Sequence, residues 1–428
     1  MTRMSFGRFA GFLFLLVVLV LSTSCGVAYA QASGASKYFR LMVTGDASNS
    51  AVIAFDANST RIADHIVHYG TEDHGREAKA YPLKASPAVI HDYKGMNNAF
   101  VRLSQLRPDT RYYFVVSDPK GVSARFWFKT SSDQAGEKLS VIAGGDSRNN
   151  RTPRRNANLL VAKLRADVVL FGGDMTGGGS SSEWSEWFED WQLTIAKDGR
   201  MTPVVVARGN HESSNEMIEK LFDTPKGVYY ASSFGGSLLR VYTLNSESGI
   251  SGEQTTWLQS DLEKNSDAVW KFAQYHKPMR PHTAGKGDGS SQYRSWASVF
   301  HKYRMNLVSE SDAHVVKSTW PLRPSTSGES HQGFVRDDRE GTVYIGEGGW
   351  GAPLRSNNDD KPWTRNSGRF NHINLIFLDK SKAEVRFIRT DNAADVEEVQ
   401  DSTRFRLPKA LDVWNPSNGA ILQLEPGT

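Results

Sequence analysis

Three short apolar runs in the middle of the chain each end in glycine followed by a polar residue, and this repeated pattern most constrains the fold. The three endings are Gly144-Gly-Asp146, Gly172-Gly-Asp174 and Gly209-Asn210-His211. Helix-like sequence at 156–165 and 182–195 separates the runs. Strand-like runs that alternate with helices predict an α/β domain, with its polar residues on loops at the strand ends.

The preceding segment, residues 37–130, consists of short β-branched and aromatic runs separated by turn residues. Several such runs at regular spacing predict a β-sandwich of roughly 100 residues. One stretch resembles the Leu-x-Pro-x-Thr-x-Tyr signature of fibronectin type III domains, and its residues are Leu106, Pro108, Thr110 and Tyr112. In those domains the tyrosine closes a corner by hydrogen bonding back to the chain, and we expect this role for Tyr112.

The first thirty residues have the composition of an export signal. Arg3 and Arg8 accompany an apolar run, residues 12–21, that is too short to span a membrane comfortably as a helix. Ala28-Tyr-Ala30 is a small-x-small cleavage site, whereas the residues before Cys25 resemble a lipobox that departs from the pattern at one position. We therefore expect an exported protein, periplasmic or extracellular, that is either released or anchored as a lipoprotein through Cys25.

Charge and cysteine content restrict the partners of the exported body. Cys25 is the only cysteine, so no disulfide can form within the chain. Removing residues 1–30 takes away two arginines and no acid, which leaves 49 basic and 47 acidic side chains. This balance gives no case for a nucleic-acid partner. The sequence does not indicate an oligomeric state.

Five short motifs follow one another between residues 145 and 314. They are Gly145-Asp146, Gly173-Asp174, Gly209-Asn-His-Glu212, Tyr275-His-Lys-Pro278 and Ser311-Asp-Ala-His314. One aspartate at a strand end is usually a turn or cap residue, but turns do not explain the ordered series. Its order and spacing resemble those of the calcineurin-like metallophosphoesterases. With the sandwich in front, the chain is similar to purple acid phosphatases.

The resemblance implies the domain organisation. We expect a fibronectin type III-like sandwich over residues 36–132 and a metallophosphoesterase domain over 138–392. The second domain would be a four-layer α/β fold with two mixed sheets between helices. Residues 393–428 form a tail to which the sequence assigns no role.

The resemblance also implies two metal ions bridged by Asp174. The first ion would bind Asp146 and His314, and the second would bind Asn210 and His276. A shared carboxylate offsets the repulsion of two cations that lie about 3.5 to 4 Å apart. Oxygen and imidazole ligands suit iron, zinc or manganese.

An enzyme of this family would hydrolyse a small phosphate monoester through a hydroxide held between the two ions. His211 would protonate the leaving alkoxide, His282 would contact the substrate and Arg148 would hold a phosphate oxygen. From the residues alone, two other readings stay open. His282 could be an exposed loop residue, and Arg148 could form an outward salt bridge.

Three positions depart from the family pattern. Arg148 replaces a histidine, and Gly177 replaces the tyrosine of purple acid phosphatases, so the first metal lacks an obvious fourth protein ligand. Asn149, Thr176 or a water could fill that place. Asp312 stands where the second metal usually has an imidazole, so we expect it to bind this metal unless it only caps a turn.

Two other functions remain open beside the monoesterase. One is a phosphodiesterase of the same fold. The other is a surface binding protein that has lost tight metal binding and uses the sandwich for contact, because a fold does not fix a function.

Overall fold

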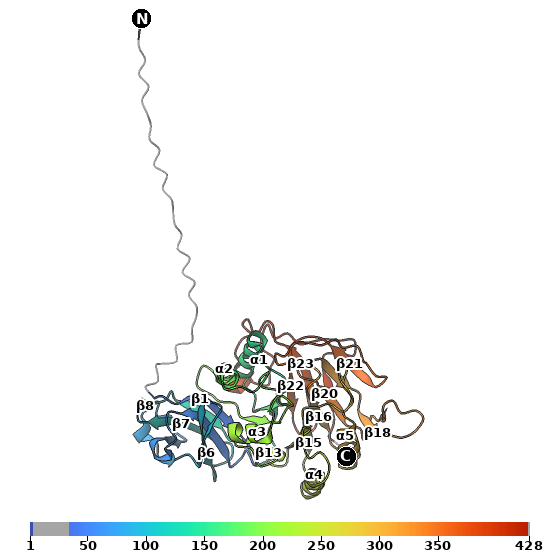
Figure 1. Ribbon diagram of the computed structural model, residues 1–428, viewed down its shortest axis with the longest axis horizontal. Helices are drawn as coiled ribbons and strands as arrows, with labels where there is room; N and C mark the ends of the chain where they lie inside the picture. Colours follow the sequence, from blue (N-terminus) through green and yellow to red (C-terminus); the bar gives the residue numbers. More distant parts are fainter. Residues whose placement is uncertain (3–33, 427–428) are drawn as a thin grey trace.

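The computed structural model describes residues 1–2 and 34–426 of the chain (Figure 1). The features of the predicted export signal, including Arg3, Arg8, the cleavage site at 28–30 and Cys25, lie outside the described residues. Within the described ranges, no helix is both long enough and apolar enough to cross a membrane.

The N-terminal part of the described chain is a β-sandwich, drawn in blue at one end of the molecule (Figure 1). Both faces of its strand β2 are buried. Ile53 and Phe55 lie in the sandwich core, whereas Val52 and Ala54 pack with the helices of the second domain. The strands are β1 (Lys37–Met42), β2 (Ala51–Ala57), β3 (Ile66–Gly70), β4 (Leu83–Ala85), β5 (Val89–Tyr93), β6 (Met96–Leu103), β7 (Arg111–Asp118), β8 (Gly121–Val122) and β9 (Phe126–Lys129).

One ten-stranded sheet runs through both domains, in the order β24-β23-β22-β10-β11-β12-β1-β2-β6-β5. The domains join where β1 pairs in parallel with β12, with Met42 opposite Val204. One sheet of the sandwich therefore continues the first sheet of the second domain, whereas β3, β4, β7, β8 and β9 form the other sheet of the sandwich. The strands contributed by the second domain are β10 (Leu139–Gly144), β11 (Val168–Phe171), β12 (Val204–Val206), β22 (His372–Leu378), β23 (Ala383–Arg389) and β24 (Leu422–Leu424).

A second sheet of seven strands packs against the first, in the order β13-β14-β15-β16-β20-β17-β21. Its centre is parallel and its edges are antiparallel, so it is mixed. Its strands are β13 (Tyr230–Phe234), β14 (Leu239–Thr243), β15 (Trp270–Gln274), β16 (Leu307–Glu310), β17 (Val316–Thr319), β20 (Val343–Gly346) and β21 (Thr364–Gly368). β18 (Leu322–Pro324) and β19 (Phe334–Arg336) form a small ribbon beside it.

Helices cover the outer faces of both sheets. The outer face of the first sheet packs with Trp184, Trp187 and Trp191, whose spacing of three and four residues places them on one side of α2. Ser180 and Glu183 form a capping box that starts this helix. The helices are α1 (Arg151–Leu164), α2 (Ser181–Trp191), α3 (Asn215–Phe222), α4 (Glu253–Lys264), α5 (Ser290–Gln292) and α6 (Ser298–Lys302), with a π-helical turn over Tyr293–Ala297.

The arrangement of two mixed sheets between helices, preceded by an all-β domain, confirms the predicted fold class. The Tyr112 hydroxyl accepts a hydrogen bond from the Arg107 N–H at 2.9 Å, which is the expected corner contact. α1 begins at Arg151, earlier than the predicted residue 156, since Pro153 in a first turn does not interrupt a helix. The unassigned tail returns to the first sheet as β24.

Candidate metal centre

The carboxyl ends of five strands meet at one place, three from the first sheet and two from the second. The loops that follow β10, β11, β12, β15 and β16 carry all the residues predicted as metal ligands. These residues are Asp146, Asp174, Asn210, His276, Asp312 and His314. Asp146 and His314, which are 168 residues apart in the chain, are thus brought into contact in one site.

The backbone at this place is held in an unfavourable conformation. Left-handed φ angles occur at five non-glycine residues, namely Asp146 (60°), Arg148 (47°), Asp174 (56°), Asp312 (66°) and His314 (57°). A side chain in this region typically costs about 1 to 2 kcal/mol. Such strain persists only where surrounding contacts enforce it, and its concentration on one set of loops favours a functional site.

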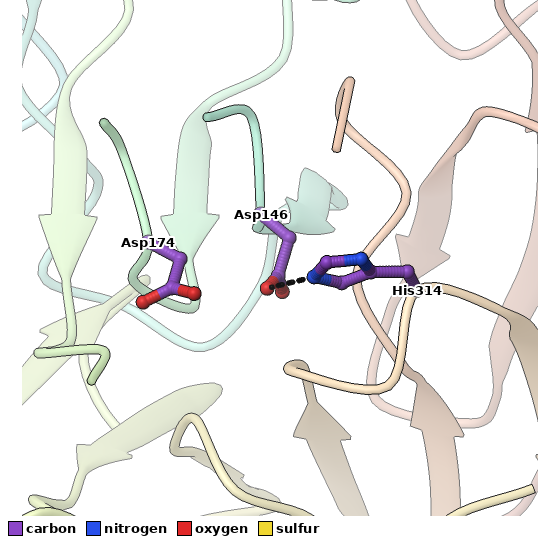
Figure 2. Close-up of side chains that lie close together, drawn as sticks. All are labelled: Asp146, Asp174 and His314. Carbon is purple, nitrogen blue, oxygen red and sulfur yellow. Dashed lines mark hydrogen bonds and ion pairs between the residues drawn. The ribbon is translucent and has the colours of Figure 1, made fainter. Parts of the chain in front are cut away.

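Asp146, Asp174 and His314 form a first group of potential metal ligands, with donor atoms all within 4.8 Å of one another. Figure 2 shows Asp146 between the other two, with the His314 ring turned toward its carboxylate. His314 Nε2 lies 3.1 Å from Asp146 Oδ1. The other ring nitrogen, Nδ1, lies 2.9 Å from the Pro353 carbonyl, so the carbonyl fixes the ring orientation and directs Nε2 into the site.

Asp174, His276 and Asp312 form a second group within the same distance limit. His276 Nε2 lies 3.3 Å from Asp174 Oδ1 and 3.5 Å from Asp312 Oδ1. The Asn210 amide oxygen is 3.1 Å from the same nitrogen. The Gly172 carbonyl, 2.9 Å from His276 Nδ1, orients this ring in turn. Asp174 therefore belongs to both groups.

Glycines and one buried glutamate hold the aspartates in place. A Cβ on Gly348 would lie 2.0 Å from Asp146 Oδ2, and one on Gly209 would lie 2.3 Å from Asp174 Oδ1. The Glu212 carboxylate accepts hydrogen bonds from the backbone N–H groups of Asp174, Met175 and Gly209 at 2.8 to 2.9 Å. The glutamate of the Gly-Asn-His-Glu motif thus joins the β11 and β12 loops.

The electrostatics of the site favour cations. Burial opposes a charge on His276, but the carboxylates of Asp174 and Asp146 raise its pKa well above its ordinary value. Burial likewise opposes ionisation of Asp174, yet His276, the His211 N–H and Arg148 keep the pKa of this carboxyl well below its usual range. Burial and the charge of Asp174 raise the pKa of Glu212 to about 7. Buried carboxylates concentrated in this way attract positive charge.

Two basic side chains contact the carboxylates. An Arg148 guanidinium nitrogen lies 3.0 Å from Asp174 Oδ2, so Arg148 faces the site and does not form an outward salt bridge. Lys286, on the loop after β15, places its ammonium 2.5 Å from Asp312 Oδ1. Sequence reasoning missed Lys286, because a lysine between two glycines in a loop carries no local signal of its role.

His211 lies at the edge of the centre. Its Nδ1 contacts the Gly177 carbonyl, which can only accept a hydrogen bond, so Nδ1 carries a proton. Its Nε2 faces Asp174 Oδ2 at 3.9 Å, and the side chain is 26% exposed. The His211 side chain is therefore partly open at the edge of the site, with Nε2 on the side of Asp174.

Asn149 and Thr176, two of the predicted alternatives for a fourth ligand of the first metal, both make contacts with the loop after β11. A Cβ on Gly177 would lie 2.5 Å from Asn149 Nδ2, so Asn149 fills the space beside this glycine. The Asn149 amide contacts Glu183 and accepts a hydrogen bond from the Gly177 N–H. Thr176 Oγ1 accepts a hydrogen bond from the Gly179 N–H. Both side chains are engaged in contacts that hold this loop. These contacts favour water as the fourth ligand of the first metal.

His282 does not lie with the other predicted site residues. Its side chain is fully buried, with Nε2 2.7 Å from the Thr364 hydroxyl and the ring edge against Trp363. The His282 N–H donates to Glu347 at 2.9 Å. The suggestion of an exposed loop histidine is wrong, and a side chain enclosed in this way is not placed to contact a substrate.

Glu347 belongs to a second buried charge cluster that the sequence interpretation did not identify. Lys317 Nζ lies 2.5 Å from both Glu310 and Glu347. A lysine directly after Val315 and Val316, in a short strand-like run, was the available signal, because an isolated buried charge must be paired.

Comparison with known proteins agrees with this organisation. Residues 37–130 match the family described as purple acid phosphatase, N-terminal domain, and residues 145–314 match the calcineurin-like phosphoesterase family. No curated protein sequence matches the chain closely enough to count as a relative.

Two solved structures share the fold. One is the purple acid phosphatase PPD1 from yellow lupin (Lupinus luteus) seeds, with a TM-score of 0.70 and 15% identity over 85% of this chain and 73% of that chain. The other is PhoD, with a TM-score of 0.64 and 11% identity over 83% of this chain and 87% of that chain. The family matches thus identify a purple acid phosphatase N-terminal domain followed by a calcineurin-like phosphoesterase domain, and the two solved structures show that the chain shares their fold.

Proposed function

We propose that the chain is an exported enzyme that hydrolyses phosphate monoesters at a two-metal centre. The observation that carries this proposal is the position of Asp174, whose carboxylate belongs to both groups of potential ligands. Two cations held close together need such a bridge. Export is supported by the composition of residues 1–30.

The residues fit two metal ions. Asp174 Oδ2 is buried and contacts Arg148 at 3.0 Å as an ion pair, but it accepts no hydrogen bond from the described residues, so it retains a lone pair for an ion. Asp146 and His314 would complete one ligand set, and Asn210, His276 and Asp312 the other. These oxygen and imidazole donors suit iron, zinc or manganese. When bound, the ions would supply the positive charge that activates water and stabilises the phosphoryl oxygens.

The protein side chains would position the ester and move one proton. Arg148 would donate hydrogen bonds to a phosphoryl oxygen, since its guanidinium already faces Asp174. His211 in its doubly protonated form would transfer the Nε2 proton to the leaving oxygen, while the Gly177 carbonyl holds Nδ1.

A second candidate function is a metal-poor binding protein. The pairs Arg148–Asp174 and Lys286–Asp312 favour it, because these two protein cations already contact carboxylates that would otherwise bind metal. Under this alternative, the chain would retain the fold without hydrolysis.

A metal add-back assay separates these functions. The purified protein is stripped of metal and supplied with manganese, zinc, iron or calcium, and bound ions and turnover of an alkyl monoester, an aryl monoester and a diester are measured. We expect two ions per chain and fastest turnover of a monoester. Faster turnover of the diester would indicate a phosphodiesterase. Less than one ion per chain, with no turnover, would indicate the binding protein.

A further inference from the structure

Lys286 neutralises one of the candidate ligands of the second metal. Its ammonium lies 2.5 Å from Asp312 Oδ1, and Asp312 itself is only 4% exposed. The second metal position is therefore balanced by a charge that the chain supplies.

The ammonium occupies Asp312 Oδ1, the same oxygen that lies 3.5 Å from His276 Nε2, so a metal ion bound between these two side chains would compete with it. Like charges a few ångströms apart repel strongly in a partly buried site. Lys286 can leave, because its side chain is 23% exposed and its four-carbon stem is flexible. Binding of the second ion would thus release the ammonium from Asp312.

The released Lys286 side chain would lie in a groove beside the centre. A groove of about 400 Å³, here called the Asp312 groove, opens beside the centre. Its lining includes Ser246, Ile250, Lys277, Lys286, Ser290 and Asp312. Lys277 is already paired with Glu247 at 2.8 Å, so Lys286 is the basic residue of the groove whose carboxylate partner would be taken by a metal.

We infer that Lys286 exchanges partners during the reaction cycle, leaving Asp312 when the second metal binds and then holding an oxygen of the phosphate group at the mouth of the Asp312 groove. This inference rests on the proposed function. The exchange makes Lys286 a substrate-binding residue and couples binding of the second metal ion to binding of the phosphate group. Metal binding creates the anion site, and by linkage the anion must tighten binding of the second metal.

Titration of the metal-stripped full-length protein with manganese, in the absence and presence of inorganic phosphate, tests the exchange by calorimetry. Without phosphate, Lys286→Met should bind the second manganese ion about tenfold more tightly than the parent, since the competing ion pair is lost. The manganese-loaded Lys286→Met protein should bind phosphate about tenfold more weakly. Lys277→Met is the matched control in the same groove and should change neither affinity. Lys286→Arg should retain phosphate affinity.

The outcomes separate this inference from the proposed function. An unchanged affinity of Lys286→Met for the second manganese ion would overturn the exchange, even if the parent is an active two-metal enzyme. Tighter manganese binding with unchanged phosphate affinity would also overturn it, because Lys286 would then be only a counter-ion. A parent protein that binds no second ion under any condition would overturn both proposals together.

Discussion

The metal centre and the buried cluster of Glu310, Lys317 and Glu347, here called the Lys317 cluster, both contain buried carboxylates near strand ends. They differ in how the carboxylate oxygens are hydrogen-bonded. In the Lys317 cluster, each carboxylate oxygen has a donor from the chain. Lys317 contacts one oxygen of Glu310 and one of Glu347. The Tyr275 hydroxyl and the Met279 N–H donate to the second Glu310 oxygen, and the His282 N–H donates to that of Glu347.

In the metal centre, by contrast, one buried carboxylate oxygen accepts no hydrogen bond from the described residues. It is Asp174 Oδ2, which contacts the Arg148 guanidinium at 3.0 Å only as an ion pair. The backbone at Asp146, Asp174, Asp312 and His314 is also left-handed, whereas that of Glu310, Lys317 and Glu347 is not. Buried carboxylates whose oxygens all accept hydrogen bonds stabilise a loop, whereas a buried carboxylate oxygen without a hydrogen bond, on a strained backbone, is prepared for an external cation.

The strongest test of this difference is Asp174→Asn. We expect turnover of phosphate esters to fall by more than about 10⁴-fold, because the shared charge that holds two ions is lost. The free energy of unfolding of the metal-free protein should fall only modestly, because Asp174 pairs with His276 and Arg148 and its pKa is depressed, but it also lies among like charges. Turnover, bound metal per chain and chemical denaturation are measured together. The exposed Asp267→Asn is the control, and a large loss of stability in Asp174→Asn would contradict the comparison.

His211→Ala tests whether the edge of the centre takes part in chemistry. Turnover of alkyl phosphates should fall about 10²- to 10⁴-fold with the metal content intact, because the proton donor is lost. The loss should be smaller for p-nitrophenyl phosphate, whose leaving group needs little protonation. Steady-state rates on both substrates decide it, and equal losses would indicate a structural or phosphate-binding role for His211.

Lys317→Met tests whether the Lys317 cluster stabilises the fold. It leaves two buried carboxylates without their counter-ion and should lower the free energy of unfolding by about 3 to 5 kcal/mol. Added manganese should not restore stability, and Lys317→Met combined with Glu347→Gln should recover part of the loss. Denaturant titration provides the measurement. Lys277→Met, which breaks a half-exposed pair, should cost less than about 1 kcal/mol. Equal costs for the two lysines would remove the distinction between the clusters.

The sequence pattern was sufficient for the fold class, and the resemblance of the five motifs to a known family supplied the positions that meet at the centre. It could not show that β1 joins the second domain, since that junction rests on one pair, Met42 and Val204. It also misplaced His282 and missed Lys286. Both lie on the loop after β15, where no periodicity constrains direction and the partners Glu347 and Asp312 come from distant segments.

The smallest expected effect concerns Asp312, where this chain departs from its family. If Asp312 binds the second metal, Asp312→His replaces a hard oxygen ligand with an imidazole, and the preference for zinc over manganese should increase about tenfold. The same substitution also removes the partner of Lys286, which should raise the affinity for both metals. Affinity alone would therefore mix two effects.

The ratio of zinc to manganese affinity separates them, because release of Lys286 acts on both metals equally and cancels from a difference of affinities. Lys286→Met provides the calibration: it should raise both affinities and leave the ratio unchanged. Competition titrations of the parent, Asp312→His and Lys286→Met give the three ratios. A ratio in Asp312→His equal to that of the parent would show that Asp312 only serves the turn before His314. A shifted ratio in Lys286→Met would show instead that the lysine, and not the carboxylate, sets metal preference.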